Sequence, residues 1–140
     1  MLSFAQFSLM KKLEDDSLHM KRSDMPQIFD DDTADFDQFL YDEKITYFNQ
    51  WLSPFQLRAS QDEFNIPTLE HLMSKPVGTS KVITSSDKFI VDGHHRVLAA
   101  MLTGIKLIEC TEIELPLIKL LEVFHAYDKV GHLSVNDSLV

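Results

Sequence analysis

Apolar residues recur at intervals of three and four along the first part of the chain, which is the spacing of an α-helix. Within residues 3–20 this pattern includes Phe4 and Phe7, and Ser3 stands in position to cap the first turn. We therefore expect an amphipathic helix here, with Phe4 and Phe7 in the core. If its apolar face were instead exposed, it would offer a surface to a protein partner.

The following stretch, residues 21–35, has no regular pattern and is expected to be a loop. Its aspartates at 30–32 favour a solvated turn or the start of a helix over a cation site. Apolar positions within 36–40 then indicate a short helix, and the β-rich residues 45–48 indicate a strand.

The second half of the chain has sharper boundaries. Ser85, Ser86 and Asp87 are good turn residues between two β-rich runs, so these runs are expected to form a hairpin. Gly104 suits the end of the helix that follows. The expected elements are an extended segment 51–58, a helix 68–74, hairpin strands 81–84 and 88–91, a helix 94–103, a strand 106–113 and a helix 116–127.

These elements predict a mixed α/β fold with a small mixed sheet and packed helices. We divide the chain into a helical N-terminal extension (1–48), a compact domain (49–130) and a polar tail (131–140). With 140 residues, 44% of them hydrophobic and 25% charged, the composition is that of one globular unit.

Charge and cysteine content narrow the function classes. The net charge of −9 argues against coating of DNA, although a local cationic pocket remains compatible with it. The single cysteine, Cys110, allows no internal disulfide and no cysteine-based zinc site, and it is expected to be buried and inert. The N-terminus lacks a signal-peptide pattern and no apolar run is long enough to span a membrane, so we expect a cytoplasmic protein.

The run Asp92-Gly93-His94-His95-Arg96 lies between an expected strand and an expected helix. Gly93 permits a sharp turn, and the unpaired amides and dipole at a helix start attract anions. Arg96 adds a bidentate cation, and the two histidines can donate hydrogen bonds to phosphate oxygens, more strongly when protonated. Asp92 would repel an anion unless it accepts a proton or helps to hold a metal.

A simpler interpretation is that Asp92 caps the helix while the histidines and the arginine are solvated. Residue type alone supports both interpretations about equally. The pairing of two histidines with an arginine on a strand–glycine–helix turn favours a binding site. Other histidines, at 71, 125 and 132, lack the spacing of metal ligands, so no resident metal site is predicted.

Residues 89–100, with the glycine at 104 and the β-rich run after it, resemble the ParB/sulfiredoxin superfamily. The upstream residues 57–64 are also similar to the segment before the first helix in ParB-like domains, so the likeness extends over roughly residues 51–113. The Asp-Gly-His-His-Arg form resembles the free serine kinases of this superfamily and small phage proteins labelled ParB-like nucleases, to which residues 25–28 are also similar.

The resemblance implies specific roles for matching positions. It assigns phosphate binding to Gly93, His94, His95 and Arg96. Asp92 would lie near the reacting hydroxyl, Glu63 would match a general base, and His94 would contribute to catalysis. Chromosome partitioning is disfavoured because no helix-turn-helix follows, and sulfinic-acid reduction because His94 replaces the required cysteine.

The implied function is nucleotide phosphate binding, with NTP-dependent phosphoryl transfer or phosphoester hydrolysis by a kinase- or nuclease-like enzyme. The expected cofactor is a nucleoside triphosphate, ATP or CTP, with Mg²⁺. Nucleic acid or a small hydroxyl compound would be the second substrate. The alternative is a non-catalytic phage accessory protein that senses a nucleotide and binds a protein partner through the N-terminal helix.

Overall fold

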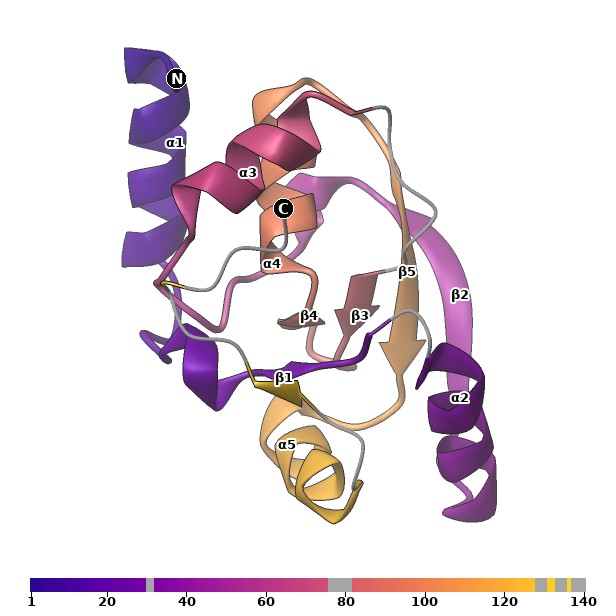
Figure 1. Ribbon diagram of the computed structural model, residues 1–140. Helices are drawn as coiled ribbons and strands as arrows, with labels where there is room; N and C mark the ends of the chain where they lie inside the picture. Colours follow the sequence, from indigo (N-terminus) through magenta and orange to yellow (C-terminus); the bar gives the residue numbers. More distant parts are fainter. Residues whose placement is uncertain (30–31, 76–81, 128–130, 133–135, 137–140) are drawn as a thin grey trace.

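A computed structural model describes residues 1–29, 32–75, 82–127, 131–132 and 136. Its centre is a four-stranded mixed sheet, so the expected mixed α/β fold is confirmed (Figure 1). The strands lie in the order β2 (Tyr47–Leu52), β5 (Ile108–Ile113), β3 (Val82–Thr84) and β4 (Ile90–Asp92).

The expected hairpin is confirmed by β3 and β4, which pair antiparallel with Ile83 opposite Asp92 and Thr84 opposite Ile90. The chain then passes through α4 (His94–Leu102) and returns as β5, which runs parallel to β3 and antiparallel to β2. Position 81 of the expected first hairpin strand lies outside the described residues. This connectivity places the strand–glycine–helix turn at one edge of the sheet.

Apolar side chains form two clusters because alternate residues of β5 point to opposite faces of the sheet. Cys110 is fully buried in the first cluster, with residues of α4 and α3 (Ile66–Met73). Ile113 is buried in the second, with residues of α2 (Thr33–Asp42) and α5 (Leu117–Ala126). Burial raises the pKa of the Cys110 thiol to about 11, which fits the expected inert cysteine.

The first helix, α1 (Phe4–Asp15), is shorter than the expected 3–20. It begins as expected, with the Ser3 side chain accepting a hydrogen bond from the Gln6 amide in a capping box. It ends early because the Ser17 hydroxyl bonds to the Glu14 carbonyl at 2.6 Å and competes with further helical hydrogen bonds.

The expectation that Phe4 and Phe7 belong to the core is wrong. Their exposed fractions are 88% and 48%, whereas Met10 on the same helix is 4% exposed and packs in the first cluster. Helical spacing identified an apolar face, but α1 docks through a neighbouring stripe that includes Met10. The two phenylalanines therefore face solvent.

The expected loop 21–35 contains a 3-10 turn, η1 (Arg22–Asp24), and a two-residue strand, β1 (Pro26–Gln27). β1 pairs antiparallel with β6 (Gly131–His132), a contact with the predicted polar tail. Later in the extension, the ring of Phe36 stacks on Phe124 of α5 with centroids 5.2 Å apart. Part of the N-terminal extension thus packs into the same core as the rest of the described chain.

Strand β2 begins two residues after the expected start at 45 and continues into the segment that was expected to be only extended. The predicted division at residue 48 falls within this strand. A single 3-10 turn, η3 (Pro54–Gln56), follows it. None of the helices in the described part of the chain is long and apolar enough to cross a bilayer.

Candidate functional site

The turn between β4 and α4 depends on Gly93. Its φ of +109° lies in the left-handed region that side chains rarely adopt. A Cβ added here would lie 3.2 Å from Val82 Cγ2 and 3.3 Å from the Arg96 guanidinium. The guanidinium therefore lies directly against the glycine, and a larger residue would have to displace it. Because Gly93 has no side chain, the N-terminus of α4 has no side-chain cap.

A cavity of about 270 Å³ opens at this turn. All five residues of the predicted motif, Asp92 to Arg96, line it. Its remaining walls come from the N-terminal segment, the segment before α3 and α3 itself: Arg22, Gln27, Ile28, Phe29, Gln61 and Leu72. The structure thus brings the motif together with residues that lie far away in the sequence.

Asp92 joins the turn to the N-terminal segment. Its side chain is almost fully buried, and one carboxylate oxygen accepts a hydrogen bond from the Ile28 amide at 2.8 Å. The other oxygen lies 3.5 Å from an Arg96 guanidinium nitrogen. Asp92 therefore positions both the β1 segment and the arginine, in addition to lining the cavity.

His94 is buried and uses its Nε2 atom to hold a neighbouring segment. Nε2 accepts hydrogen bonds from the Ser60 amide at 3.0 Å and the Gln61 amide at 3.3 Å. Burial lowers the pKa of His94 well below its ordinary value, and the neighbouring His95 lowers it further. The ring is thus neutral at pH 7, with its proton on Nδ1.

His95 is held in the same way. Its Nε2 atom accepts a hydrogen bond from the Asn65 amide at 2.8 Å, and its ring packs edge-on to Phe64. Burial lowers its pKa to about 3, and the charges of Arg22 and Arg96 add to the effect. Neither histidine therefore contributes positive charge at neutral pH, and contact of either ring with a phosphate would use the Nδ1 side.

His94 and Gln61 both line the cavity, and each has a buried side-chain atom without a hydrogen-bond partner among the described residues: His94 Nδ1, a donor, and Gln61 Oε1, an acceptor. The orientation of the Gln61 amide is fixed because its nitrogen donates to the Glu63 carbonyl at 2.7 Å. Buried polar groups are nearly always paired in folded proteins. A ligand would contact these two atoms only if the side chains that cover them shifted, because both atoms are almost inaccessible to solvent.

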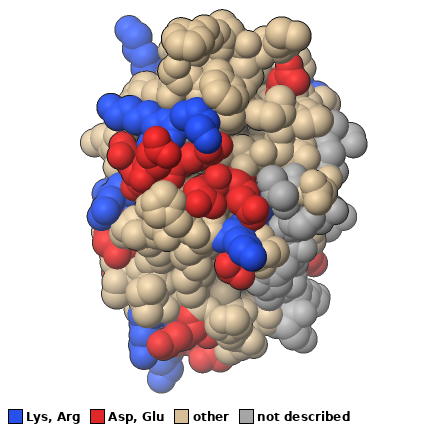
Figure 2. All heavy atoms as spheres, turned by 90° about the vertical axis from the view of Figure 1, so that its left-hand side faces the viewer, with Lys and Arg blue, Asp and Glu red and all other residues tan. Residues whose placement is uncertain are grey.

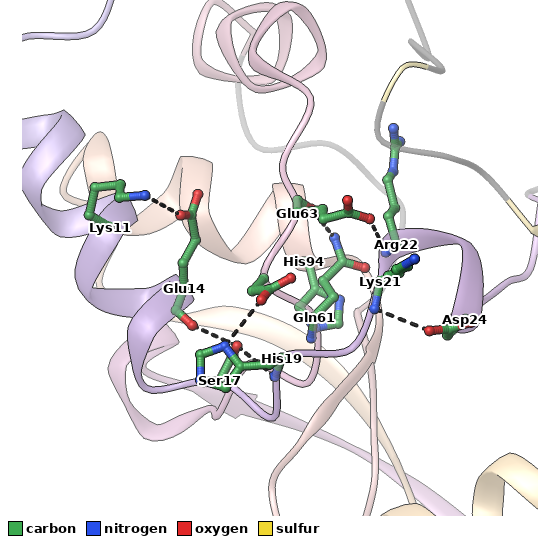
Figure 3. Close-up of polar contacts among 11 residues, drawn as sticks. Lys11, Glu14, Ser17, His19, Lys21, Arg22, Asp24, Gln61, Glu63 and His94 are labelled. Carbon is green, nitrogen blue, oxygen red and sulfur yellow. Dashed lines mark hydrogen bonds and ion pairs between the residues drawn. The ribbon is translucent and has the colours of Figure 1, made fainter.

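Glu63, the predicted general base, does not line the cavity. Its carboxylate accepts a hydrogen bond from the Arg22 backbone amide at 3.0 Å, as Figure 3 shows. It thereby fixes η1 and the start of the Arg22 side chain, which is 1% exposed. The sequence showed Arg22 only as half of the basic pair Lys21-Arg22, and no local signal indicated that it would be buried at this cavity.

The electrostatic balance at the cavity favours an anion. Two guanidinium groups and the positive end of the α4 dipole outweigh the single carboxylate of Asp92. The surface on the α1 side is different, because acidic and basic side chains there lie next to one another rather than forming a basic face (Figure 2). Within the described ranges, no group of three histidine, cysteine or acidic residues could hold a metal ion.

No protein-family model and no curated protein sequence matches this chain. A solved structure of a Pnob8-like ParB-N domain is similar to 61% of the chain, with a TM-score of 0.47 and 15% sequence identity. The match spans 39% of that ParB-N chain.

Proposed function

We propose that the cavity at the β4–α4 turn binds phosphate groups of a nucleotide. The observation that carries this proposal is the placement of Arg96 against Gly93 at the uncapped N-terminus of α4, with Arg22 in the wall of the same cavity. Backbone amides at a helix start and a guanidinium are the donors that phosphate oxygens accept best.

The cavity is large enough for part of a nucleotide but not for all of it. About 270 Å³ lies just below the usual range of roughly 300–1,000 Å³ for small-molecule pockets. The phosphates would therefore occupy the cavity while the sugar and base lie at its mouth. Phe29 lines the cavity and is 44% exposed, so its ring offers an apolar surface for that part of the ligand.

NTP-dependent phosphoryl transfer or phosphoester hydrolysis is the catalytic form of this proposal. Asp92 would orient the attacking hydroxyl or water, and neutral His94 would donate from Nδ1 to a phosphate oxygen. Mg²⁺ arriving with the nucleotide would offset the repulsion between phosphate and carboxylate. A single protein carboxylate suffices for this because Mg²⁺ is held largely by substrate phosphates.

One observation favours the alternative, a nucleotide sensor without turnover. Both oxygens of Asp92 already have positioning contacts, one with the Ile28 amide and one with Arg96. A general base must reach its substrate with a lone pair, and these two contacts together with the near-complete burial of the side chain restrict that approach. Binding without chemistry needs only the arginines and the helix start.

Calorimetric titration of the purified chain with ATP, CTP, GTP and pyrophosphate, with and without Mg²⁺, tests the binding step. We expect at least one nucleotide to bind the wild type and Arg96→Gln to weaken that binding tenfold or more, since a lost charged hydrogen bond costs about 1.5–3 kcal/mol. Arg58→Gln is the matched control, because Arg58 packs over the Phe89 ring outside the cavity. Absence of binding by every ligand, or equal losses in both variants, would overturn the proposal.

Turnover is tested separately with γ-labelled nucleotide and with single- and double-stranded DNA. The catalytic form predicts release or transfer of phosphate that Asp92→Asn abolishes while nucleotide binding persists. Binding without turnover in the wild type identifies the sensor alternative. Activity that survives in both Asp92→Asn and Arg96→Gln would come from another site or from a contaminant.

A further inference from the structure

Strand β2 lies at the edge of the sheet and pairs with β5 alone among the described strands. Its register runs without a shift from Tyr47 opposite Ile113 to Leu52 opposite Ile108. Figure 1 shows β2 as a long, outermost arrow beside β5. No bulge, proline or short length protects this edge, although such features are common on natural edge strands.

The hydrogen-bond alternation identifies the outward-pointing backbone groups. The Glu114 amide donates to the Thr46 carbonyl at 3.0 Å, so position 46 bonds toward β5. Because the direction alternates along an antiparallel pair, positions 48, 50 and 52 also bond toward β5. The amides and carbonyls of Tyr47, Asn49 and Trp51 therefore point away from the sheet.

This edge is uncharged and rich in exposed aromatic side chains. Residues 45–57 contain no charged residue, in a chain of which 25% is charged. The exposed fractions are 37% for Tyr47, 40% for Phe48 and 62% for Trp51. An exposed strand of this kind is a template for pairing with another strand.

We propose that β2 pairs antiparallel with β2 of a second copy of this chain, about a twofold axis at Asn49. In this register Asn49 lies opposite Asn49 of the other copy, and Tyr47 of each copy lies opposite Trp51 of the other. All three outward-pointing residues of each copy then take part, giving six backbone hydrogen bonds between the copies by the same alternation. The Tyr47–Trp51 pairs fall on one face of the joined sheet, where cross-strand aromatic pairs are stabilising.

The charge distribution makes a second copy a suitable occupant. Each chain carries a net charge of −9, so two copies repel each other least where they meet through uncharged residues. Residues 45–57 form an uncharged edge strand between the cations Lys44 and Arg58, and the acidic residue paired with Trp51, Glu109, lies on the inner side, in β5. A single strand pair buries less than the roughly 1,200 Å² of a stable interface, so we expect a dimer of micromolar affinity.

Sedimentation equilibrium over a low- to high-micromolar concentration series tests the dimer. The wild type should shift from monomer to dimer across the series. Asn49→Lys and Asn49→Asp should each remain monomeric, because the twofold axis places like charges directly opposite one another. An equimolar mixture of the two variants should restore dimerisation, since every heterodimer pairs opposite charges at the axis.

Among the registers of this strand pair, only the proposed one predicts that mixing the two variants restores dimerisation. Circular dichroism of each variant checks that its monomer is folded. Crosslinking gives a second readout, because directly opposed residues in a bonded pair lie within disulfide reach, with Cα atoms about 5.5 Å apart. Asn49→Cys should form a covalent dimer under mild oxidation. Tyr41→Cys, with an exposed thiol on α2, is the matched control and should not do so faster than random collision allows.

Three results would overturn the proposal. A wild type that stays monomeric at the highest concentration removes the dimer. A dimer that persists in both charged variants places the interface elsewhere. A mixture that stays monomeric while each variant is folded excludes the twofold pairing at Asn49.

Discussion

The two edges of the sheet are built in different ways. At β4 the edge is covered, because the Ile90 amide donates to the Arg58 carbonyl at 2.8 Å and Asp92 accepts from the Ile28 amide. At β2 the described chain leaves the edge open, with Trp51 62% exposed. Buried polar groups are concentrated at the covered edge, whereas the open edge has uncharged aromatic residues. One sheet thus separates a surface suited to a charged ligand from a surface suited to another strand.

The largest difference between the edges should appear on removal of the Asp92 carboxylate. Asp92→Ala leaves the buried Ile28 amide without this acceptor and removes the carboxylate beside Arg96. We expect the free energy of unfolding, measured by urea denaturation, to fall by about 3 kcal/mol.

Asn49→Ala is the control on the open edge, where it removes the acceptor of the Thr111 hydroxyl at 2.9 Å. It should cost about 1 kcal/mol or less. Equal losses in the two variants would show that Asp92 does not hold the covered edge.

The second-largest effect on the free energy of unfolding should come from a change of pH. His95 is neutral when folded, with a pKa near 3, and takes up a proton below its ordinary pKa of 6.5 when unfolded. Its contribution to stability is complete above pH 6.5 and is lost as the pH falls from 6.5 toward 3. The slope is about 1.4 kcal/mol per pH unit, or roughly 2 kcal/mol by pH 5.

Urea denaturation at several pH values checks this expectation. His95→Gln keeps an acceptor for the Asn65 amide but cannot titrate, so its stability should vary less steeply between pH 6.5 and 5. His125→Gln, which changes an exposed histidine of α5, is the matched control for the loss of an imidazole. A His95→Gln slope equal to that of the wild type would contradict a neutral buried His95.

Glycine substitutions separate close packing from backbone strain. Gly93→Ala combines a left-handed φ with a 3.2 Å contact to Val82, and should lower the free energy of unfolding by about 2 kcal/mol. Gly104→Ala has a positive φ of +75° but nothing within 4 Å of the added Cβ, and should cost about 1 kcal/mol. Thermal unfolding of both variants measures the difference. A larger loss at Gly104 would mean that Gly93 is not closely packed.

The smallest effect on monomer stability is expected at the open edge. Trp51→Ser should change the free energy of unfolding at low concentration by less than about 0.5 kcal/mol, because the side chain is mostly exposed. Its neighbour Leu52 is only 8% exposed, so Leu52→Ala should lower the free energy of unfolding by about 2–5 kcal/mol. A large loss for Trp51→Ser would show that the edge contributes to the monomer core.

Local signals in the sequence identified most of the fold. α3 lies close to the expected helix 68–74, turn residues join β3 to β4, and Gly93 precedes α4 as expected. Errors arose where packing rather than spacing decides. The end of α1 and the exposure of Phe4 depend on how that helix docks, and its apolar pattern does not specify the docking.

The sequence predicts only some of the residues that line the cavity. Residues 92–96 stand together in the sequence and were expected to form a site, and the structure places them around one cavity. Arg22 and Gln61 come from segments remote in sequence, and their contribution depends on long-range hydrogen bonds such as that between the Ile28 amide and Asp92. No periodicity encodes such contacts. The roles of Asp92, Glu63 and His94 in catalysis remain predictions for the nucleotide experiments.

The strand order has a consequence for synthesis on the ribosome. β2 finds its partner in β5, and the nearest paired residues of the two strands are Leu52 and Ile108. At about 5–20 residues per second, β2 emerges several seconds before β5 exists. During that interval its aromatic residues are exposed on the nascent polypeptide, open to chaperones and to neighbouring chains on the same messenger RNA. A strand that favours pairing with an identical strand would then be exposed to such pairing before the fold is complete.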